Sequence, residues 1–164
     1  MSDGYDLTAD RFTVGTIGEV GRRMFLLQCR QGDVLLTLKI EKQQVAMTAE
    51  YLSGIVKAQA RPGHLPEDLE LELPLEPAWA VGTIGVSYDE ADDRIVLIVE
   101  ELVAEGENGA IARLTVTREQ AAAFCIQATT LVESGRPPCP LCGSPLDPAG
   151  HDCPRTNGHR PPIV

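Results

Sequence analysis

The chain is poor in aromatic residues and in positive charge. Of its 164 residues, 4% are Phe, Trp or Tyr, and 14 Lys and Arg stand against 24 Asp and Glu, for a formal net charge of −10. A hydrophobic core must therefore be built mainly from Val, Leu, Ile and Ala. Such an acidic chain lacks a basic face for phosphates or for an anionic membrane, so we expect no nucleic-acid or membrane ligand. A basic protein partner remains compatible with this charge.

Several patterns of enzymes and of exported or membrane proteins are missing. No apolar run approaches the length of a membrane span, and the polar start, Met1-Ser-Asp-Gly-Tyr-Asp6, has no apolar stretch typical of a secretory signal. The nucleophile elbow GxSxG, the P-loop and GxGxxG are absent as well. We expect a cytoplasmic protein, and these absences lean against an enzyme.

A repeated pattern divides the first 135 residues into two units. The segment Phe12-Thr-Val-Gly-Thr-Ile-Gly18 returns as Trp79-Ala-Val-Gly-Thr-Ile-Gly85, with five of seven positions identical. Several matches in one order predict an internal duplication, although two strands of one sheet can share such patterning without common descent. The later matches pair Arg23-Met-Phe-Leu-Leu-Gln28 with Arg94-Ile-Val-Leu-Ile-Val99, and Leu36-Thr-Leu-Lys-Ile-Glu41 with Leu114-Thr-Val-Thr-Arg-Glu119.

Each unit predicts three strands followed by a helix. Apolar, β-rich segments between turn residues indicate the strands, and apolar residues at helical spacing indicate the helices. Thr117 and Gln120 have the spacing of a capping box at the start of the second helix. The predicted strands cover about 11–17, 22–30, 34–40, 78–87, 94–103 and 110–116, and the helices cover 41–60 and 118–133.

These elements predict an α+β fold in which duplicated βββα units form a mainly antiparallel sheet with two helices on one face. A pseudo-twofold axis could relate the units. We expect a core domain over residues 1–135, with repeat one at about 11–60, a linker at about 61–77 and repeat two at about 78–135. Alternation at 69–74 indicates either an extended linker or an edge strand. Residues 136–164 form a separate zinc-binding tail.

The tail holds three of the five cysteines and two of the three histidines. Cys139-Pro-Leu-Cys142-Gly143 has the spacing of a zinc knuckle, and Cys153 offers a third thiolate. His151 or His159 would be the fourth ligand. We favour His151, because Gly150 permits a sharp approach. Three thiolates and one imidazole leave no open position for water, so Cys139, Cys142, His151 and Cys153 predict a structural zinc site.

A redox function is a weaker alternative for the CxxC motif. Redox motifs of this spacing open a helix in a βαβ unit, whereas Pro140 and Gly143 indicate a turn. The clustered, odd-numbered cysteines fit a reducing compartment better than a disulfide framework. Cys29 and Cys125 lie in apolar segments and are predicted to be small core residues.

With these motifs the chain resembles an uncharacterised actinobacterial family of unknown function. The resemblance spans nearly the full length and includes Arg11-Phe12-x-x-Gly15-Thr16-x-Gly18. Its tail motif contains the Gly-His-x-Cys-Pro segment, which favours His151 over His159. Members typically occur beside a histidine-phosphatase-like protein and a phosphoinositide-kinase-like protein, so the resemblance implies cytoplasmic partners, with those two as candidates. The tail motif reads Cys139-Pro-Leu-Cys142-Gly143, Pro145 and Gly150-His151-x-Cys153-Pro154-Arg155-x-Asn157-Gly158.

Two functions remain open at this point. The first is a non-enzymatic, zinc-containing interaction or regulatory module with a protein partner. The alternative is an enzyme or a binder of a small metabolite, for example a phosphorylated one, in a groove between the two repeats. Thr16 and Thr83 of the duplicated Gly-Thr-Ile-Gly segments would line that groove, beside groups with perturbed pKa values. The sequence does not fix an oligomeric state.

Overall fold

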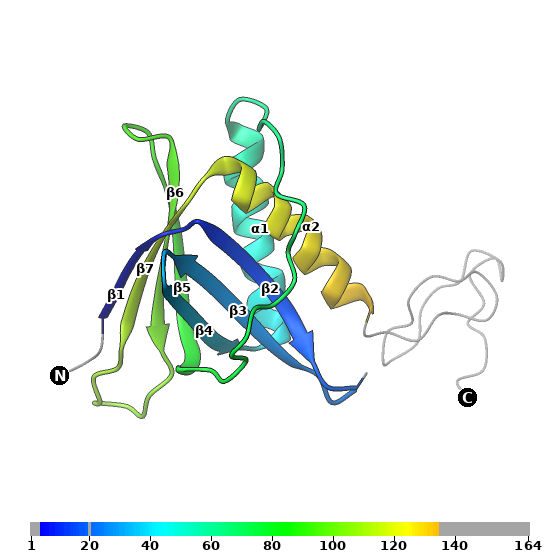
Figure 1. Cartoon of the computed structure of the whole chain (residues 1–164). Coiled ribbons are helices and arrows are strands. Elements are labelled where there is room, and N and C mark those ends of the chain that lie inside the picture. The colour runs from blue at the N-terminus through cyan, green and yellow to red at the C-terminus, as the bar shows by residue number, and fades with distance from the viewer. Residues whose placement is uncertain (1–3, 20, 135–164) are drawn as a thin grey trace, which may run out of the picture.

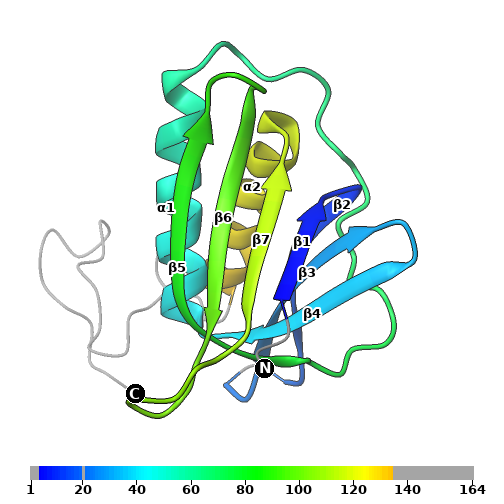
Figure 2. The same cartoon turned by 90° about the vertical axis from the view of Figure 1, so that its left-hand side faces the viewer.

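A computed structural model describes residues 4–19 and 21–134 and shows two helices packed on one face of a seven-stranded sheet (Figures 1 and 2). The predicted elements agree with the observed ones to within two residues at each end, and one strand precedes them. The elements are β1 (Gly4–Thr8), β2 (Arg11–Ile17), β3 (Met24–Gln31), β4 (Val34–Ile40), α1 (Lys42–Ala58), β5 (Trp79–Asp89), β6 (Arg94–Glu101), β7 (Ile111–Val116) and α2 (Arg118–Ser134).

The sheet is mainly antiparallel, with the strand order β1-β7-β6-β5-β4-β3-β2. The pairs β2–β3, β3–β4, β5–β6 and β6–β7 are antiparallel. The pairs β4–β5 and β1–β7 are parallel. The α+β class and the mainly antiparallel sheet are therefore confirmed.

Strand β1 is the element that the sequence prediction lacks. It runs parallel to β7, with Leu7 opposite Leu114, and both side chains are buried. The segment offers a single pair of alternating apolar residues, Tyr5 and Leu7, between polar neighbours. So short a pattern does not identify a strand, because the partner that buries it comes from the far end of the core.

The two edge strands of the sheet are one continuous stretch of chain (Figure 1). They are separated by Ala9 and Asp10. The Ala9 amide donates to the Thr115 carbonyl at 2.8 Å, and the Asp10 amide donates to the Arg30 carbonyl at 2.8 Å. At this bend the backbone stops pairing with β7 and begins to pair with β3. The sheet therefore curls until its two edges meet.

Both helices begin with reciprocal capping bonds. At α2 the Thr117 amide donates to Gln120 Oε1 at 2.8 Å, and the Gln120 amide donates to Thr117 Oγ1 at 3.0 Å. This is the predicted capping box. At α1 the Glu41 and Gln44 side chains form the equivalent pair. Within residues 4–19 and 21–134, no helix is long and apolar enough to cross a membrane.

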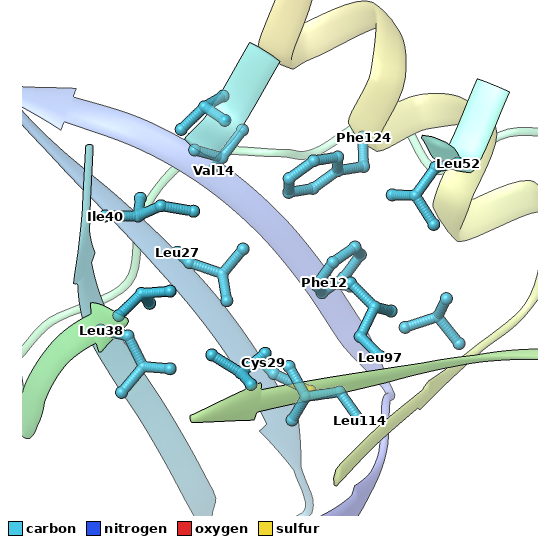
Figure 3. Close-up of a cluster of buried hydrophobic side chains, with 14 of the residues drawn as sticks. Phe12, Val14, Leu27, Cys29, Leu38, Ile40, Leu52, Leu97, Leu114 and Phe124 are labelled. Carbon is cyan, nitrogen blue, oxygen red and sulfur yellow. The ribbon is translucent and has the colours of Figure 1, made fainter. Parts of the chain in front are cut away.

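The core lies between the helices and the inner face of the sheet (Figure 3). Phe12 of β2 stacks on Phe124 of α2, with ring centroids 4.6 Å apart and an interplanar angle of 16°. The side chains around this pair are largely aliphatic, as the scarcity of aromatic residues predicts. They include Val14, Leu27, Leu38, Ile40, Leu52, Leu97 and Leu114, all fully or almost fully buried.

The predicted linker crosses the outer face of β2 and β3 (Figure 1), and we call residues 59–78 the strap. The Gln28 side chain binds both the backbone amide and the backbone carbonyl of Glu72 in the strap. The Glu72 amide donates to Gln28 Oε1 at 2.8 Å, and Gln28 Nε2 donates to the Glu72 carbonyl at 2.8 Å. Thr13 Oγ1 donates to the Leu69 carbonyl at 2.6 Å. Residues 69–74 are thus an extended part of the linker and not an edge strand.

Ion pairs reinforce the strap along one edge. The Arg11 guanidinium lies 3.1 Å from an Asp68 carboxylate oxygen and 2.9 Å from one of Glu72, and Arg30 lies 3.1 Å from the same Glu72 oxygen. The Arg11 side chain is largely buried, so its charge is met by these carboxylates instead of by water. The strap is therefore an integral layer of the fold.

The two units differ in how their outer faces are covered. In each unit three strands lead into a helix, and the last strand of each unit has a parallel neighbour: β4 pairs with β5, and β7 pairs with β1. The strap covers the outer face of the first unit. Among the described residues, no segment crosses the outer face of β5–β7, which faces the viewer in Figure 2. A common origin of the units remains a prediction.

Candidate functional site

The predicted zinc ligands lie outside the part of the chain that the structure describes. This holds for Cys139, Cys142, His151 and Cys153, and also for the alternative ligand His159. Within residues 4–19 and 21–134, no group of three or more His, Cys, Asp or Glu side chains could hold a metal ion. The zinc site therefore stays a prediction.

The two cysteines of the core pack as small apolar residues. Cys29 is buried, and burial raises the pKa of its thiol to about 12. Cys125 is half-buried, its Sγ donates to the Ala49 carbonyl at 3.3 Å, and burial raises its pKa to about 11. Both stay protonated near neutral pH, so neither supplies a thiolate nucleophile.

The structure does not bring Thr16 and Thr83 into one groove. Strands β3 and β4 lie between β2 and β5, which carry the two threonines. Thr16 lines a hollow together with Leu71 of the strap and Gln127 of α2. Thr83 is exposed, and its hydroxyl donates to Glu100 Oε2 at 2.7 Å.

A polar cluster forms where α2 starts. Arg118 Nε lies 3.0 Å from Asp93 Oδ1, and Nη2 lies 3.2 Å from Oδ2. The Tyr88 hydroxyl donates to Asp93 Oδ1 at 2.7 Å, and Arg118 also donates through Nη1 to the Ala60 carbonyl of the strap. Asp93 adopts a φ of 50°, in the left-handed region. The cluster ties the β5–β6 turn, α2 and the strap together.

The pKa shifts in this cluster all favour the ordinary charge states. Hydrogen bonds from Tyr88 and Arg118 lower the pKa of Asp93, and the bond to Asp93 raises the pKa of Tyr88. The bond to Asp93 also raises the pKa of Arg118. A general acid or base needs a pKa near the working pH, and these shifts move each group away from neutrality. The cluster is an anchor between elements.

The outer side of β5–β7 exposes Ile98 and Ile111, and the exposed Leu102 and Val103 follow directly after β6; we call these four residues the open face. Ile98 pairs laterally with Gly85 on β5 and with Arg113 on β7. Ile111 pairs with Glu100, which makes Ile98 and Ile111 diagonal neighbours on one face. Leu102, just past the end of β6, is 65% exposed.

A hollow of about 820 Å³ adjoins the open face, and we call it the acidic hollow. Gly109 allows its wall to close, because a Cβ there would lie 2.9 Å from both the Glu101 and Val103 side chains. The volume lies in the range of ligand-sized sites. The lining residues are Ala78, Trp79, Glu100, Glu101, Val103, Glu107, Asn108, Gly109, Ala110 and Ile111.

The polar groups of the acidic hollow are partly committed. Glu101 Oε1 accepts from the Ala110 amide at 2.9 Å, while Glu100 accepts from Thr83. Trp79 Nε1 is buried and has no hydrogen-bond partner among the described residues. Burying an unpaired N–H costs about 1–3 kcal/mol, so an added acceptor would stabilise this site. The hollow therefore offers the carboxylates of Glu100, Glu101 and Glu107 for a cation.

Sequence reasoning placed these residues without joining them. Trp79 entered the sequence analysis only as part of the repeated segment, and Glu100 and Glu101 belong to no motif. The signal that could have found the open face is Ile95-Val-Leu-Ile-Val99, which is apolar at successive positions. A strand with apolar residues on both faces is typically covered on both. Here the described residues cover the inner face and leave Ile98 exposed.

The chain matches the family described as "Protein of unknown function (DUF3090)" over residues 5–153. The matched range contains the core, the strap and the tail as far as Cys153. No curated protein and no solved structure matches the chain significantly. Because the match spans most of its length, the protein belongs to this family.

Proposed function

We propose that this member of the family is a non-enzymatic interaction or regulatory module. In this proposal its tail holds a structural zinc ion, and its open face binds a protein partner. The observation that carries the binding function is β6, whose run Ile95–Val99 is apolar on both faces while Ile98 stays exposed. Apolar side chains gathered on one face are typical of interaction sites.

The charge around the open face indicates the chemistry of the partner. Glu100 and Glu107 line the adjoining hollow, in a chain with a net charge of −10. A partner surface with Lys or Arg beside an apolar side chain would complement both features.

The zinc proposal assigns Cys139, Cys142, His151 and Cys153 as ligands. The family match supports counting the tail as part of the conserved unit of the family, because it extends to Cys153. It also includes His151 and leaves out His159, in agreement with the preferred ligand set. A site closed by four protein ligands stabilises the tail and performs no catalysis.

The resemblance noted in the sequence suggests where to look for the partner. It implies an actinobacterial, cytoplasmic protein, with the histidine-phosphatase-like and the phosphoinositide-kinase-like proteins as candidates. We include the duplication of the βββα unit in the same proposal. It would explain why β4–β5 and β7–β1 are the two parallel pairs of the sheet.

Metal analysis tests the zinc part alone. Purified full-length protein should contain about one zinc per chain by mass spectrometry, and Cys139→Ser with Cys142→Ser should lose it. The core should stay folded in that variant, which circular dichroism would check. If freshly reduced and fully folded protein contains no zinc, the zinc proposal is wrong. The binding proposal is unaffected by that result.

Direct binding tests the open face. Each of the two candidate proteins, purified, would be titrated against the full chain by calorimetry. Ile98→Asp with Ile111→Asp should weaken binding about tenfold or more, because both anchors become charged. Ile126→Asp is the control, since Ile126 is also apolar and is more exposed (61%, against 37% for Ile98 and 46% for Ile111) but lies on α2. Equal affinity of both variants, or no binding of either protein, would contradict the proposal.

The metabolite-binding alternative gains no support at the position first considered for it. Thr16 and Thr83 lie on separated strands, and Thr83 already donates to Glu100. The perturbed pKa values belong to the anchor residues Tyr88, Asp93 and Arg118 and to the core thiols of Cys29 and Cys125, which stay protonated. We therefore rank a protein partner first.

A further inference from the structure

A second hollow, of about 450 Å³, lies where the β2–β3 turn meets the end of β4 and the start of α1. Four of its lining side chains are basic: Arg22, Arg23, Lys39 and Lys42. They come from two segments of the chain, residues 21–25 and 39–42. We call this site the basic hollow.

The composition of the basic hollow is unusual for this protein. The whole chain has 14 Lys and Arg against 24 Asp and Glu, yet four basic residues meet around one concave site. Its single acidic residue is Glu41, whose side chain is engaged in the capping box of α1. The hollow therefore concentrates positive charge in a chain whose other surface is mostly acidic.

Three of these cations are not neutralised within the part of the chain that the structure describes. There, the side chains of Arg22, Lys39 and Lys42 have neither an ion-pair partner nor a hydrogen-bond partner. The contrast with Arg11 and Arg118 is direct, because each of those guanidiniums pairs with a carboxylate. In a chain with excess carboxylates, unpaired cations that converge on a hollow favour an anion from outside.

The position of Lys42 also opposes a local rule of helix stability. Lys42 is the first residue of α1, and the first turn of this 17-residue helix contains no acidic residue. A cation there is repelled by the positive end of the helix dipole. Natural sequences tend to break such rules at functional sites, where a ligand compensates. A bound anion would interact favourably with Lys42, while the N-cap Glu41 carboxylate already accepts from the backbone of the helix end.

We propose that the basic hollow binds the phosphoryl group of a small phosphorylated metabolite. Lys39 and Lys42 would contact the phosphoryl oxygens as point charges, and the planar Arg22 guanidinium would add paired hydrogen bonds. The volume of about 450 Å³ suits a small organic phosphate. A nucleic acid is disfavoured, because the net charge of −10 repels a long polyanion. This site is distinct from the open face and does not depend on a protein partner.

Thermal unfolding of the full chain with three probes tests the proposal. The probes are inorganic phosphate, pyrophosphate and ribose 5-phosphate, each at ~10 mM and compared with sodium chloride at equal ionic strength. Binding to the folded state should raise Tm by roughly 2–5 °C over the salt control. Phosphate and pyrophosphate acting alone would identify an inorganic ligand, whereas stronger stabilisation by ribose 5-phosphate would identify an organic one.

Matched variants show whether the effect arises in the basic hollow. Binding should also broaden the phosphorus NMR signal of each probe. The double variant Lys39→Gln with Lys42→Gln should abolish both the stabilisation and this broadening. Lys57→Gln with Arg61→Gln removes the same charge at exposed positions outside the hollow and should retain both. Equal stabilisation of the two double variants, or no shift beyond the salt control with any probe, would overturn the proposal. Folding of each variant is checked by its unliganded Tm.

Discussion

Leu71 of the strap lies directly over Gly15 of β2, where a Cβ would approach Leu71 Cγ to 2.5 Å. The strap can lie this close because position 15 has no side chain. With the Gln28 clamp on Glu72, this contact fixes the strap against the outer face of the sheet. Leu71 and Glu72 lie in a segment that sequence patterning alone would class as a linker.

Gly15→Ala should therefore destabilise the protein by about 1–3 kcal/mol, because the added methyl group must displace Leu71. Urea unfolding at equilibrium would measure the loss. Gly85→Ala is the control, since Gly85 lies in β5 with nothing within 4 Å of a built Cβ. It should be neutral within about 0.5 kcal/mol or slightly stabilising. Equal losses for the two variants would contradict close packing of the strap.

The stacked aromatic pair should dominate the core energetically. Phe124→Ala removes a fully buried ring that faces Phe12, and it should cost about 3–5 kcal/mol. A double-mutant cycle with Phe12→Leu and Phe124→Leu should give a coupling of about 0.5–1.5 kcal/mol. Denaturant unfolding supplies all four free energies. Additive losses would show that the rings contribute by burial alone.

The Asp93 anchor should shape the acid limb of stability. Since the pKa of Asp93 is lowered in the folded protein, its contribution is present above the unfolded value of 3.8. It is lost as the pH falls through the lower folded value. Asp93→Asn should lower Tm at pH 7 and flatten the decline of Tm below about pH 4. Thermal unfolding from pH 2 to 7 would compare the two proteins.

The same anchor predicts a change at high pH. Because the bond to Asp93 raises the pKa of Tyr88 above 10.0, its contribution is present below that value. It is lost as the pH rises through the higher folded value. Tyr88→Phe should remove this alkaline component and also reduce the acid limb, because the hydrogen bond from Tyr88 is the largest cause of the lowered pKa of Asp93. If the Tm of Tyr88→Phe differs from that of the unmodified protein by the same amount at every pH, the assigned hydrogen bond is contradicted.

Cysteine alkylation should separate the core from the tail. With raised pKa values and burial, Cys29 and Cys125 should resist iodoacetamide at pH 8 in the folded protein. The three tail cysteines should be protected by zinc and become labelled once a chelator removes it. Mass spectrometry should then show three labels after chelation and five after denaturation. Three labels before chelation would contradict the zinc site.

The fold was largely accessible from the sequence because its elements are amphipathic and separated by clear turns. The capping box at Thr117 and Gln120 located the start of α2 to the residue. Strand β1 was not accessible, since its partner β7 lies at the other end of the core. The strap was ambiguous for a related reason. Its alternation at 69–74 reflects contact with an outer face, which a strand pattern also produces.

The functional surfaces were harder to foresee. Arg22 is distant in sequence from Lys39 and Lys42, and the pairing of β3 with β4 brings the two segments together. The open face exists because no described segment covers Ile98, and a local sequence pattern does not encode such exposure. The zinc ligands show the reverse case. Their spacing is local, so the sequence predicts them directly, while the described residues do not include them.

The join at Ala9 and Asp10 has a consequence for how the chain reaches this fold. Pairing of β1 with β7 places residues 4–8 beside residues 111–115, so the first strand to leave the ribosome must wait for the last. Long-range pairing of this kind slows folding, and unpaired strands expose the growing chain to aggregation. Until β7 is synthesised, Leu7 has no partner strand. The sheet therefore cannot be completed before residue 116 is synthesised, and truncation before that residue should leave a chain that chaperones retain.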